Sequence, residues 1–278
     1  MTDASLPLAG VVGWPVAHSL SPRLHGHWLQ RYGIPGHYVP LEVRQQDFEA
    51  ALRMLPKLGF SGVNLTLPYK ETVLPLADSV SDRASLIGAA NTITFREDGG
   101  VSADNTDGFG FLESIRATVP DWDPKTGPAL VLGAGGASRA IVSALLGEGV
   151  PEVRLSNRTR QRADMLADHF GARAQVVDWN RAADAADGTS LIVNTTSLGM
   201  AGRPELGFRL DAAPRRALVT DIVYSPLRTP LLEAAAARGH PTVDGLGMLL
   251  FQAVPGFESW FGRRPEVDGV LRQAVLAQ

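Results

Sequence analysis

The residue of this chain best suited to proton transfer is Lys70. Only 3 of its 26 basic residues are lysines, and an amine with an ordinary pKa of ~10.4 can be tuned to exchange a proton, whereas a guanidinium cannot near neutrality. Lys57 and Lys125 fit surface positions, at an expected helix end and in a proline-rich segment. Lys70 instead closely follows Asn64 and Thr66. We interpret it as an acid or base, with a surface lysine as the alternative.

Polar side chains accompany Lys70 in four short clusters of the first half of the chain. Each cluster is expected at the end of a strand, and the carboxyl ends of parallel strands face the ligand crevice. Hydroxyl and amide groups in such a place suit a small polyhydroxylated ligand, with one hydrogen bond for each group. The clusters are His18–Ser21, Asn64–Thr66 with Lys70, Asn91, and Asn105–Asp107.

Each cluster also has a purely local interpretation. Ser21 fits the N-cap of the helix expected after it, and Asn91 and Asn105 fit turns. Asp107 fits two roles: it could hold the Lys70 ammonium and support proton transfer, or it could cap the next helix. The spacing of these residues leaves both interpretations open.

A glycine-rich turn follows the apolar run Ala129–Leu132. It reads Gly-Ala-Gly-Gly-Ala over residues 133–137, and a helix-forming run comes next. Glycine lets such a turn bend tightly and approach a pyrophosphate, which the helix N-terminus then stabilises. Ser138 stands at the third glycine of the dinucleotide-binding fingerprint, so the match is imperfect, and an ordinary strand-to-helix turn is the alternative.

The segment after the next strand favours NADP(H) over NAD(H). It begins at Asn157, 24 residues after the turn starts, close to the ~20-residue spacing of a ribose-reading residue. NAD sites usually place a carboxylate there, whereas a guanidinium suits a phosphate. This chain has Arg158 and Thr159, followed by Arg160 and Arg162. A solvated helix start is the alternative, and it suits Arg160 best.

Length and composition exclude several classes of protein. The 278 residues suggest about two domains, and a hydrophobic fraction of 45% allows a large core. A formal net charge of −3 argues against a general binder of nucleic acid or acidic membranes. The absence of cysteine excludes disulfides, thiolate nucleophiles and cysteine-ligated metals. Because no stretch fits a spanning helix or a secretory signal, we expect a soluble, cytoplasmic protein without a metal.

Short apolar runs alternate with helical patterns, which is typical of parallel strands joined by crossover helices. The expected strands are 8–12, 37–41, 63–65, 91–95, 101–103, 129–132, 153–156, 174–177, 191–194 and 218–222. The expected helices are 22–32, 47–58, 78–87, 108–118, 138–146, 160–169 and 230–238. We also expect a hairpin turn at Asp98–Gly100, a linker at Pro120–Pro128, and a tail from Gly247 of one or two helices broken by Pro255 and Pro265.

Taken together, these motifs resemble the shikimate dehydrogenase family over nearly the whole chain. Any single motif is unspecific, but their order and combination are highly specific. The matching stretches are GWPVAHSLSPRLH (13–25), NLTLPYK (64–70), GAANT (88–92), NTDGFG (105–110), GAGGASRA (133–140), NRTRQRA (157–163), NTTSLGM (194–200), DIVYSPLRTPLL (221–232) and DGLGMLLFQA (244–253).

The resemblance implies an α/β protein with an N-terminal α/β substrate domain, a Rossmann-type doubly wound dinucleotide-binding domain, and a cleft between them. The substrate domain would cover 1–108, completed by C-terminal helices at 245–278, and the NADP-binding domain would cover 109–244. The implied activity is the NADPH-dependent reduction of 3-dehydroshikimate to shikimate, a step of aromatic amino-acid biosynthesis. A monomer or homodimer with a small-molecule substrate would carry it out.

The resemblance also implies roles for the residues that match the family's motifs. Lys70 and Asp107 would form the catalytic pair, with charged Lys70 donating a proton to the carbonyl oxygen as hydride arrives. The substrate carboxylate would be held by Ser19, Ser21 and Tyr224, and its hydroxyls by Asn64, Thr66, Asn91, Asp107 and Gln252. The cofactor would lie near Asp82, Gly133, Ala134, Gly135, Gly136, Ala137, Asn157, Arg158, Thr159, Arg162, Thr195, Ile222, Gly245 and Met248.

Two residues depart from the family's pattern. Gly26 stands where Asn usually follows His25, which bears on how the serine loop is supported, and Leu65 replaces the usual Val. Two other functions stay open. One is a related quinate/shikimate dehydrogenase, for which an NAD-reading acid is expected near Arg158. The other is a non-catalytic NADP(H)-binding regulatory protein, which has little use for a proton-transfer pair.

Overall fold

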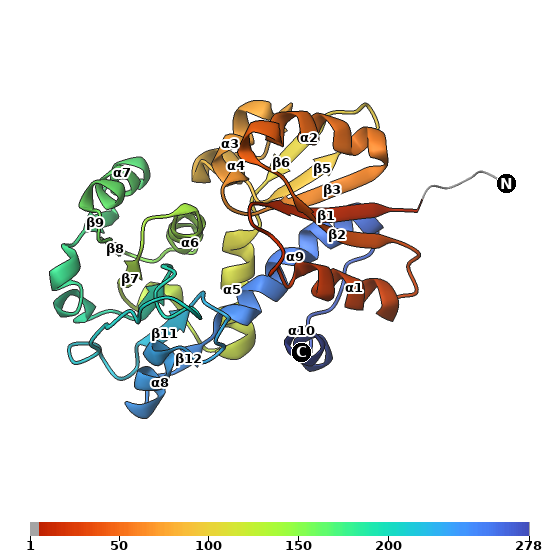
Figure 1. Ribbon diagram of the computed structural model, residues 1–278. Coiled ribbons are helices and arrows are strands. Elements are labelled where there is room, and N and C mark those ends of the chain that lie inside the picture. The colour runs from red at the N-terminus through yellow and green to blue at the C-terminus, as the bar shows by residue number, and fades with distance from the viewer. Residues whose placement is uncertain (1–5, 278) are drawn as a thin grey trace. The chain divides into compact units, whose positions relative to one another are not determined.

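The protein folds into two compact units that each contain one β-sheet (Figure 1). The computed structural model describes residues 6–277. The first unit comprises the chain up to Thr106 together with the stretch from Leu250 onward, and the second comprises Asp107–Leu249. Both units combine helices with a sheet, so the fold is α/β, as the alternation of apolar runs and helical patterns predicts.

The sheet of the first unit is mixed. Its strands lie in the order β2-β1-β3-β5-β6-β4. All neighbouring pairs are parallel except those of β5, which runs antiparallel to β3 and β6. The predicted hairpin turn joins β5 to β6, and Gly99 takes a φ of +81° there. The strands are β1 (Leu8–Gly13), β2 (His37–Glu42), β3 (Phe60–Leu65), β4 (Ser79–Val80), β5 (Thr92–Phe95) and β6 (Val101–Asp104).

Helices from both ends of the chain pack in the first unit. Phe48 and Leu52, one turn apart, enter its core beside Ile93 of β5. From the C-terminal part, Trp260 donates its indole N–H to the Ile93 carbonyl at 3.0 Å, and Gly62 of β3 leaves room for that indole. The helices are α1 (Ser21–Arg31), α2 (Phe48–Met54), α3 (Tyr69–Thr72), α4 (Asp82–Ile87), α9 (Gly245–Phe261) and α10 (Gly269–Leu276).

Two of the predicted helical segments differ in the structure. Pro255 does not break the tail, because α9 runs through it. Leu250, Val254 and Phe257 share one buried face of that helix, and their packing outweighs the roughly 3 kcal/mol that an interior proline costs. The helix expected from 78 begins only at Asp82, since the two residues of β4 precede it and pair with β6.

The sheet of the second unit is entirely parallel. Its order is β12-β11-β10-β7-β8-β9. Numbered within the unit and read from β9, this is 3-2-1-4-5-6, the order of the dinucleotide-binding (Rossmann) fold, which binds its ligand where the order reverses, beyond the carboxyl ends of β7 and β10. The strands are β7 (Ala129–Leu132), β8 (Val153–Ser156), β9 (Ala174–Val176), β10 (Leu191–Asn194), β11 (Leu218–Asp221) and β12 (Thr242–Val243).

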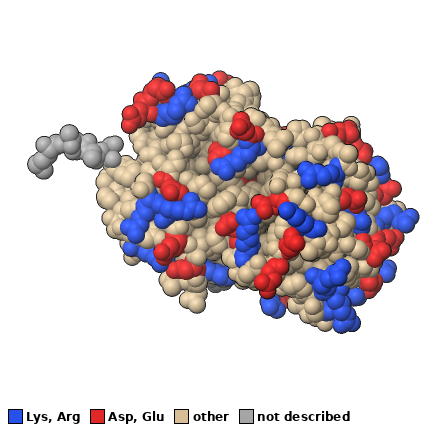
Figure 2. Space-filling model, turned by 180° about the vertical axis from the view of Figure 1, so that it is seen from behind, with Lys and Arg blue, Asp and Glu red and all other residues tan. Residues whose placement is uncertain are grey.

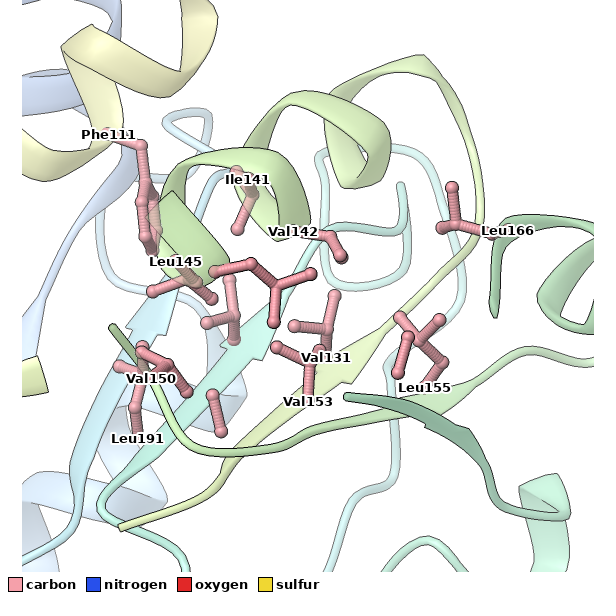
Figure 3. Close-up of a cluster of buried hydrophobic side chains, with 14 of the residues drawn as sticks. Phe111, Val131, Ile141, Val142, Leu145, Val150, Val153, Leu155, Leu166 and Leu191 are labelled. Carbon is pink, nitrogen blue, oxygen red and sulfur yellow. The ribbon is translucent and has the colours of Figure 1, made fainter. Parts of the chain in front are cut away.

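The core of the second unit lies between this sheet and the helices on it. In Figure 3, Val131 of β7 lies under Ile141 and Leu145, and Phe111 points toward the same helix. Gly108 brings Phe111's helix close, since a Cβ there would lie 2.9 Å from the Ala140 carbonyl oxygen. The helices are α5 (Asp107–Thr118), α6 (Gly136–Gly147), α7 (Arg160–Phe170) and α8 (Pro230–Ala237).

The segment Pro120–Pro128 does not separate the two units, contrary to the prediction of a linker. It lies inside the second unit, between α5 and β7. The reason is that α5 belongs to the second unit's core, where Phe111 and Ile115 are buried. The chain passes from one unit to the other before α5, between Thr106 and Asp107.

Charged side chains of both signs are interspersed on the face shown in Figure 2. Exposed ion pairs of the described chain, such as Arg181–Asp184 and Arg264–Glu258, contribute about 0–1 kcal/mol each. No helix within residues 6–277 is long and apolar enough to cross a membrane. In the same part of the chain, no three His, Asp or Glu side chains gather as metal ligands would.

Candidate active site

The polar clusters of the first half meet at one edge of the first sheet. β1, β3 and β6 end at this edge. The prediction that Asn91 follows a strand is wrong, because Asn91 precedes β5. β5 runs antiparallel, with Thr92 opposite both Asn64 and Asp104, so its amino end lies among the carboxyl ends of its neighbours. Asn91 therefore reaches the same edge from the opposite strand direction.

The amide of Asn64 is fixed by three hydrogen bonds. The Tyr38 hydroxyl donates to Oδ1 at 2.7 Å, while Nδ2 donates to the Asn91 carbonyl at 3.2 Å and to Thr92 Oγ1 at 3.3 Å. Burial raises the pKa of Tyr38 well above its ordinary value, so its hydroxyl remains a donor at neutral pH. Both protons of the Asn64 amide are thus in use, and Oδ1 keeps a lone pair for a ligand hydroxyl.

Asn91 joins two strands of this edge to the C-terminal part of the chain. Its Nδ2 donates to Gln252 Oε1 on α9 and to Thr106 Oγ1 after β6, both at 3.1 Å. Its Oδ1 accepts the Thr106 backbone N–H at 2.8 Å. All three residues are less than 9% exposed. The structure thus brings the predicted substrate residues Asn64, Asn91 and Gln252 into one buried network, which the Thr92 hydroxyl connects.

Ser19 and Ser21 lie between β1 and the first turn of α1. The prediction of Ser21 as N-cap is wrong, because the helix begins at Ser21 itself and Ser19 Oγ accepts the Ser21 N–H at 3.3 Å. The Ser21 side chain hydrogen-bonds the Tyr38 hydroxyl, so Tyr38 connects the serine loop with Asn64. A Cβ at Gly26 would meet no atom within 4 Å, so the structure also has room for a larger residue there.

Thr66 and Lys70 follow β3 at the same edge. The Thr66 N–H donates to the Val12 carbonyl at 3.0 Å, and Gly13 permits this approach, since a Cβ there would lie 2.5 Å from Thr66 Cγ2. Lys70 is half-buried on the short helix α3. Its backbone carbonyl accepts the Ala90 N–H at 2.7 Å, which joins α3 to the start of β5. Lys70 therefore belongs to the polar edge.

The predicted carboxylates begin helices. Asp107 is the first residue of α5, is 5% exposed, and directly follows Thr106 in the chain. Asp82 is the first residue of α4 and is exposed. Between the two, Asn105 is buried and its Nδ2 donates to the Ala89 carbonyl at 2.9 Å, which gives it the structural role that the turn interpretation predicts.

The glycine-rich turn of the second unit has the form that a pyrophosphate requires. Gly133 takes a φ of +117°, and a Cβ there would collide with Thr195 Oγ1. A Cβ at Gly135 or Gly136 would meet nothing within 4 Å, so the space above the turn is open. The N–H groups of Gly136 and Ala137 have no acceptor within α6, and the helix N-terminus favours an anion. These residues fit a dinucleotide phosphate.

The arginines after β8 differ in their partners. Arg160, in the first turn of α7, forms ion pairs with Asp178 and Asp164. Within the described range 6–277, no carboxylate pairs with Arg158 or Arg162, and both are exposed. Cations at a helix start oppose its dipole. Two uncompensated guanidiniums there therefore fit a bound phosphate, whereas Arg160 has the surface role expected of it.

Two further residues predicted to lie near the cofactor shape the carboxyl edge of the second sheet. Asn157 follows β8, and its Nδ2 donates to the Thr159 carbonyl at 2.8 Å, which closes the turn that carries Arg158. Thr195 follows β10, and its hydroxyl donates to the Leu132 carbonyl at 2.8 Å. The ends of β7 and β10, where the strand order reverses, are thereby joined.

The residues after β11 meet the start of α9. A Cβ at Gly245 would collide with the Ile222 carbonyl, so only glycine lets the helix begin this close to the strand end. Met248 lies one turn later and packs against the core of the second unit. Burial raises the pKa of Tyr224, so its hydroxyl stays protonated and can donate a hydrogen bond to an anion.

Sequence reasoning missed a buried carboxylate at the end of β11. Asp221 is 1% exposed and accepts hydrogen bonds from Asn194 Nδ2 at 2.9 Å, Thr229 Oγ1 at 2.8 Å and the Val223 N–H at 3.0 Å. Burial raises its pKa. It holds together the two segments that carry Thr195 and the residues after β11. Its position at the end of the expected strand 218–222, inside a matching motif, is the signal that could have found it.

Three protein-family models match the chain in succession. The shikimate dehydrogenase substrate binding domain matches residues 11–93, the shikimate / quinate 5-dehydrogenase model matches 118–200, and the shikimate 5′-dehydrogenase C-terminal domain matches 245–275. The chain belongs to the shikimate dehydrogenase family. The resemblance of its motifs to this family is thus confirmed.

Relatives and solved structures match at least 96% of the chain. The shikimate dehydrogenase (NADP(+)) of Dinoroseobacter shibae is 60% identical over 278 residues, which is 100% of both chains. The shikimate 5-dehydrogenase of Thermus thermophilus, solved with NADP(H) and shikimate, is 38% identical with a TM-score of 0.86, covering 96% of this chain and 98% of that one. The quinate dehydrogenase of Corynebacterium glutamicum, solved with NAD, is 32% identical with a TM-score of 0.90, covering 97% and 98%.

Proposed function

We propose that this protein catalyses the reversible, NADPH-dependent reduction of 3-dehydroshikimate to shikimate in the route to chorismate and aromatic amino acids. The observation that carries the proposal is the polar edge of the first sheet. Asn64, Asn91 and Gln252 share one buried hydrogen-bond network there, and the Lys70 helix joins the same edge. Full-length identity of 60% to an NADP(+)-dependent family member supports it.

The two units divide the work in this proposal. The first unit, with the helices after Leu250, acts as the substrate domain, and the second acts as the NADP-binding domain. Ser19, Ser21 and Tyr224 hold the substrate carboxylate, because hydroxyl donors suit an anion. The substrate hydroxyls bind the side chains of Asn64, Thr66, Asn91, Asp107 and Gln252.

The Asn91–Gln252 bond gives a physical account of how a hydroxyl enters this network. The two amides bind each other at 3.1 Å. A substrate hydroxyl both donates and accepts hydrogen bonds, so it can accept the hydrogen bond that Asn91 Nδ2 otherwise donates to Gln252, and can donate one of its own to Gln252 Oε1. One amide–amide bond is then replaced by two bonds to the ligand, and no buried polar group is left unpaired.

Lys70 and Asp107 carry the proton transfer. Bound NADPH supplies the hydride. The Lys70 ammonium hydrogen-bonds the ketone oxygen and donates a proton as negative charge develops on it, and Asp107 supports the charged amine. In the reverse direction, neutral Lys70 accepts the alcohol proton. Arginine at position 70 would keep the positive charge but could not release the proton near neutral pH.

The residues that follow β8 favour NADP(H) over NAD(H). Arg158 and Arg162 bind the 2′-phosphate of NADP(H), Asn157 and Thr159 shape the turn that carries Arg158, and Gly133–Ala137 bind the pyrophosphate. Thr195, Ile222, Gly245 and Met248 lie near the ribose or nicotinamide, and Asp82 lies nearby. A carboxylate that would read the ribose of NAD is absent from residues 153–163.

Initial rates with the four combinations of NADPH or NADH and 3-dehydroshikimate or 3-dehydroquinate test this function. We expect the highest kcat/KM with NADPH and 3-dehydroshikimate. A preference for NADH with 3-dehydroquinate would instead indicate a quinate dehydrogenase, and NADPH binding without turnover would indicate a regulatory protein.

The Lys70→Arg variant tests the proposed proton donor. Loss of general acid catalysis should lower kcat by about 10²–10⁴-fold while NADPH affinity stays unchanged. Lys57→Arg is the matched control, since Lys57 is exposed. Near-normal turnover by Lys70→Arg would leave Lys70 only an electrostatic role.

A further inference from the structure

Ser138 occupies the fingerprint position that a third glycine usually fills, and its side chain is fully buried. The Gly135 N–H donates to Ser138 Oγ at 3.1 Å. Ser138 Oγ lies 2.5 Å from Thr195 Oγ1, and the Thr195 hydroxyl donates to the Leu132 carbonyl at 2.8 Å. These hydrogen bonds join four residues from three separate parts of the chain into one relay: Gly135, Ser138, Thr195 and Leu132.

The number of hydroxyl protons determines which group donates and which accepts in each hydrogen bond of this relay. Each hydroxyl has one proton to donate, and the Thr195 proton goes to Leu132, whose carbonyl can only accept. Ser138 must therefore donate to Thr195, which leaves its oxygen lone pairs to accept the Gly135 N–H. Every donor and acceptor in the relay is paired, as buried polar groups require.

The relay determines which N–H groups of the turn can meet an anion. Because the Gly135 N–H points to Ser138, the groups left at the helix start are those of Gly136 and Ala137, below the open space at Gly135 and Gly136. At the other end of the turn, the Gly133 N–H donates to the Ser156 carbonyl at 2.8 Å. The turn is thereby anchored to both β8 and β10.

We propose that Ser138 is a positioning residue for NADP(H). Through Thr195 it holds the Gly133–Ala137 turn in the shape that presents Gly136 and Ala137 to the pyrophosphate, a task that close helix packing performs where the third glycine is present. The Thr195 hydroxyl donates to Leu132 and so has no proton left for the cofactor. This inference rests on the proposed NADPH-dependent function.

The test compares NADPH binding by Ser138→Ala with that by Ser143→Ala. Both residues lie on α6, but no hydrogen bond of the Ser143 side chain is found in the described structure. Losing the relay should weaken NADPH binding about 3- to 10-fold, the effect of one neutral hydrogen bond, in a direct titration. Ser143→Ala should bind like the parent, and KM for 3-dehydroshikimate should not change in either variant.

Thr195 supplies the second half of the test. Thr195→Val removes the acceptor and donor of the relay, so the double variant with Ser138→Ala should bind NADPH about as weakly as Thr195→Val alone, and Thr195→Ser should retain parental binding. Additive losses, or a Ser138→Ala variant that binds like the parent, would overturn the relay even if turnover is normal. If instead the parent binds NADPH and the variants lose affinity as expected, but the parent reduces no ketone, the proposed function is refuted and the relay still holds.

Discussion

Replacing Arg158 with alanine should weaken NADPH binding far more than the same change at Arg160. The two arginines are two positions apart, yet Arg160 is neutralised by Asp178 and Asp164 while Arg158 has no ion-pair partner in the described chain. Arg158 is thus available to a phosphate. The two variants Arg158→Ala and Arg160→Ala therefore compare the same loss of a guanidinium at an unpaired and at a paired position.

The size of the effect follows from the kind of bond lost. A hydrogen bond to a charged group contributes about 1.5–3 kcal/mol, and a factor of ten in affinity is ~1.4 kcal/mol. Arg158→Ala should therefore weaken NADPH binding roughly 10- to 150-fold. NADH lacks the 2′-phosphate, so its affinity should stay within about threefold. Arg158→Asp should weaken NADPH binding further, because a carboxylate would repel the phosphate.

Calorimetric titration of each variant with NADPH and NADH measures both affinities independently of turnover. Arg160→Ala should change neither affinity by more than about threefold, since its guanidinium is committed to carboxylates. Parental NADPH affinity in Arg158→Ala would refute the contact between Arg158 and the phosphate. An equal loss of NADH affinity in that variant, or an equal loss of NADPH affinity in Arg160→Ala, would refute it as well. Raising the salt concentration should narrow the difference between the parent and Arg158→Ala, because the contact is exposed.

Three other changes probe the units separately. Burial lowers the pKa of His25 to about 3, below its unfolded value of ~6.5, so the unfolded chain binds more protons and stability falls as pH drops below 6.5. At about pH 5 the parent should have lost roughly 2 kcal/mol of its free energy of unfolding, as measured by urea denaturation. The His25→Phe variant can keep the stack on Tyr38 and should not show this loss. An equal dependence of unfolding free energy on pH in the parent and the variant would contradict this. Gly133→Ala should lower the Tm and weaken NADPH binding at least tenfold, because its Cβ would collide with Thr195 at a φ of +117°; parental binding by the variant would show that the turn can adapt. Tyr38→Phe removes the hydrogen bond to Asn64 and should raise KM for 3-dehydroshikimate about 2- to 10-fold without changing KM for NADPH. Tyr32→Phe is the control. An equal rise of KM for 3-dehydroshikimate in both variants would refute a role of Tyr38 in positioning Asn64.

The strands of the second sheet were the easiest part of the fold to predict. A strand buried on both faces often has a continuous apolar sequence, as Ala129–Leu132 does, and the predicted bounds 129–132, 153–156 and 191–194 are those of the structure. The strands β4 and β12 have two residues each, too few for any pattern. The hairpin turn at Asp98–Gly100 predicts the antiparallel pairing of β5 with β6, whereas the pairing of β5 with β3 depends on distant contacts that no local pattern encodes.

The candidate site divides in the same way. Residue types and motifs identified Lys70, Asn64 and the glycine-rich turn, since each has a chemical signature within a few positions. The partners that hold such residues lie far away in sequence: Ser138 meets Thr195 across 57 positions, and Tyr38 meets Asn64 across 26. A single sequence contains no signal for such pairs, because either residue alone fits an ordinary surface or core position.

The reduction itself is tested most directly by following NADPH loss and shikimate formation in the same reaction with 3-dehydroshikimate. We expect one shikimate for each NADPH consumed, and a much lower rate when NADH replaces NADPH. Folded protein that forms no shikimate, or that forms it as fast with NADH, would contradict the account.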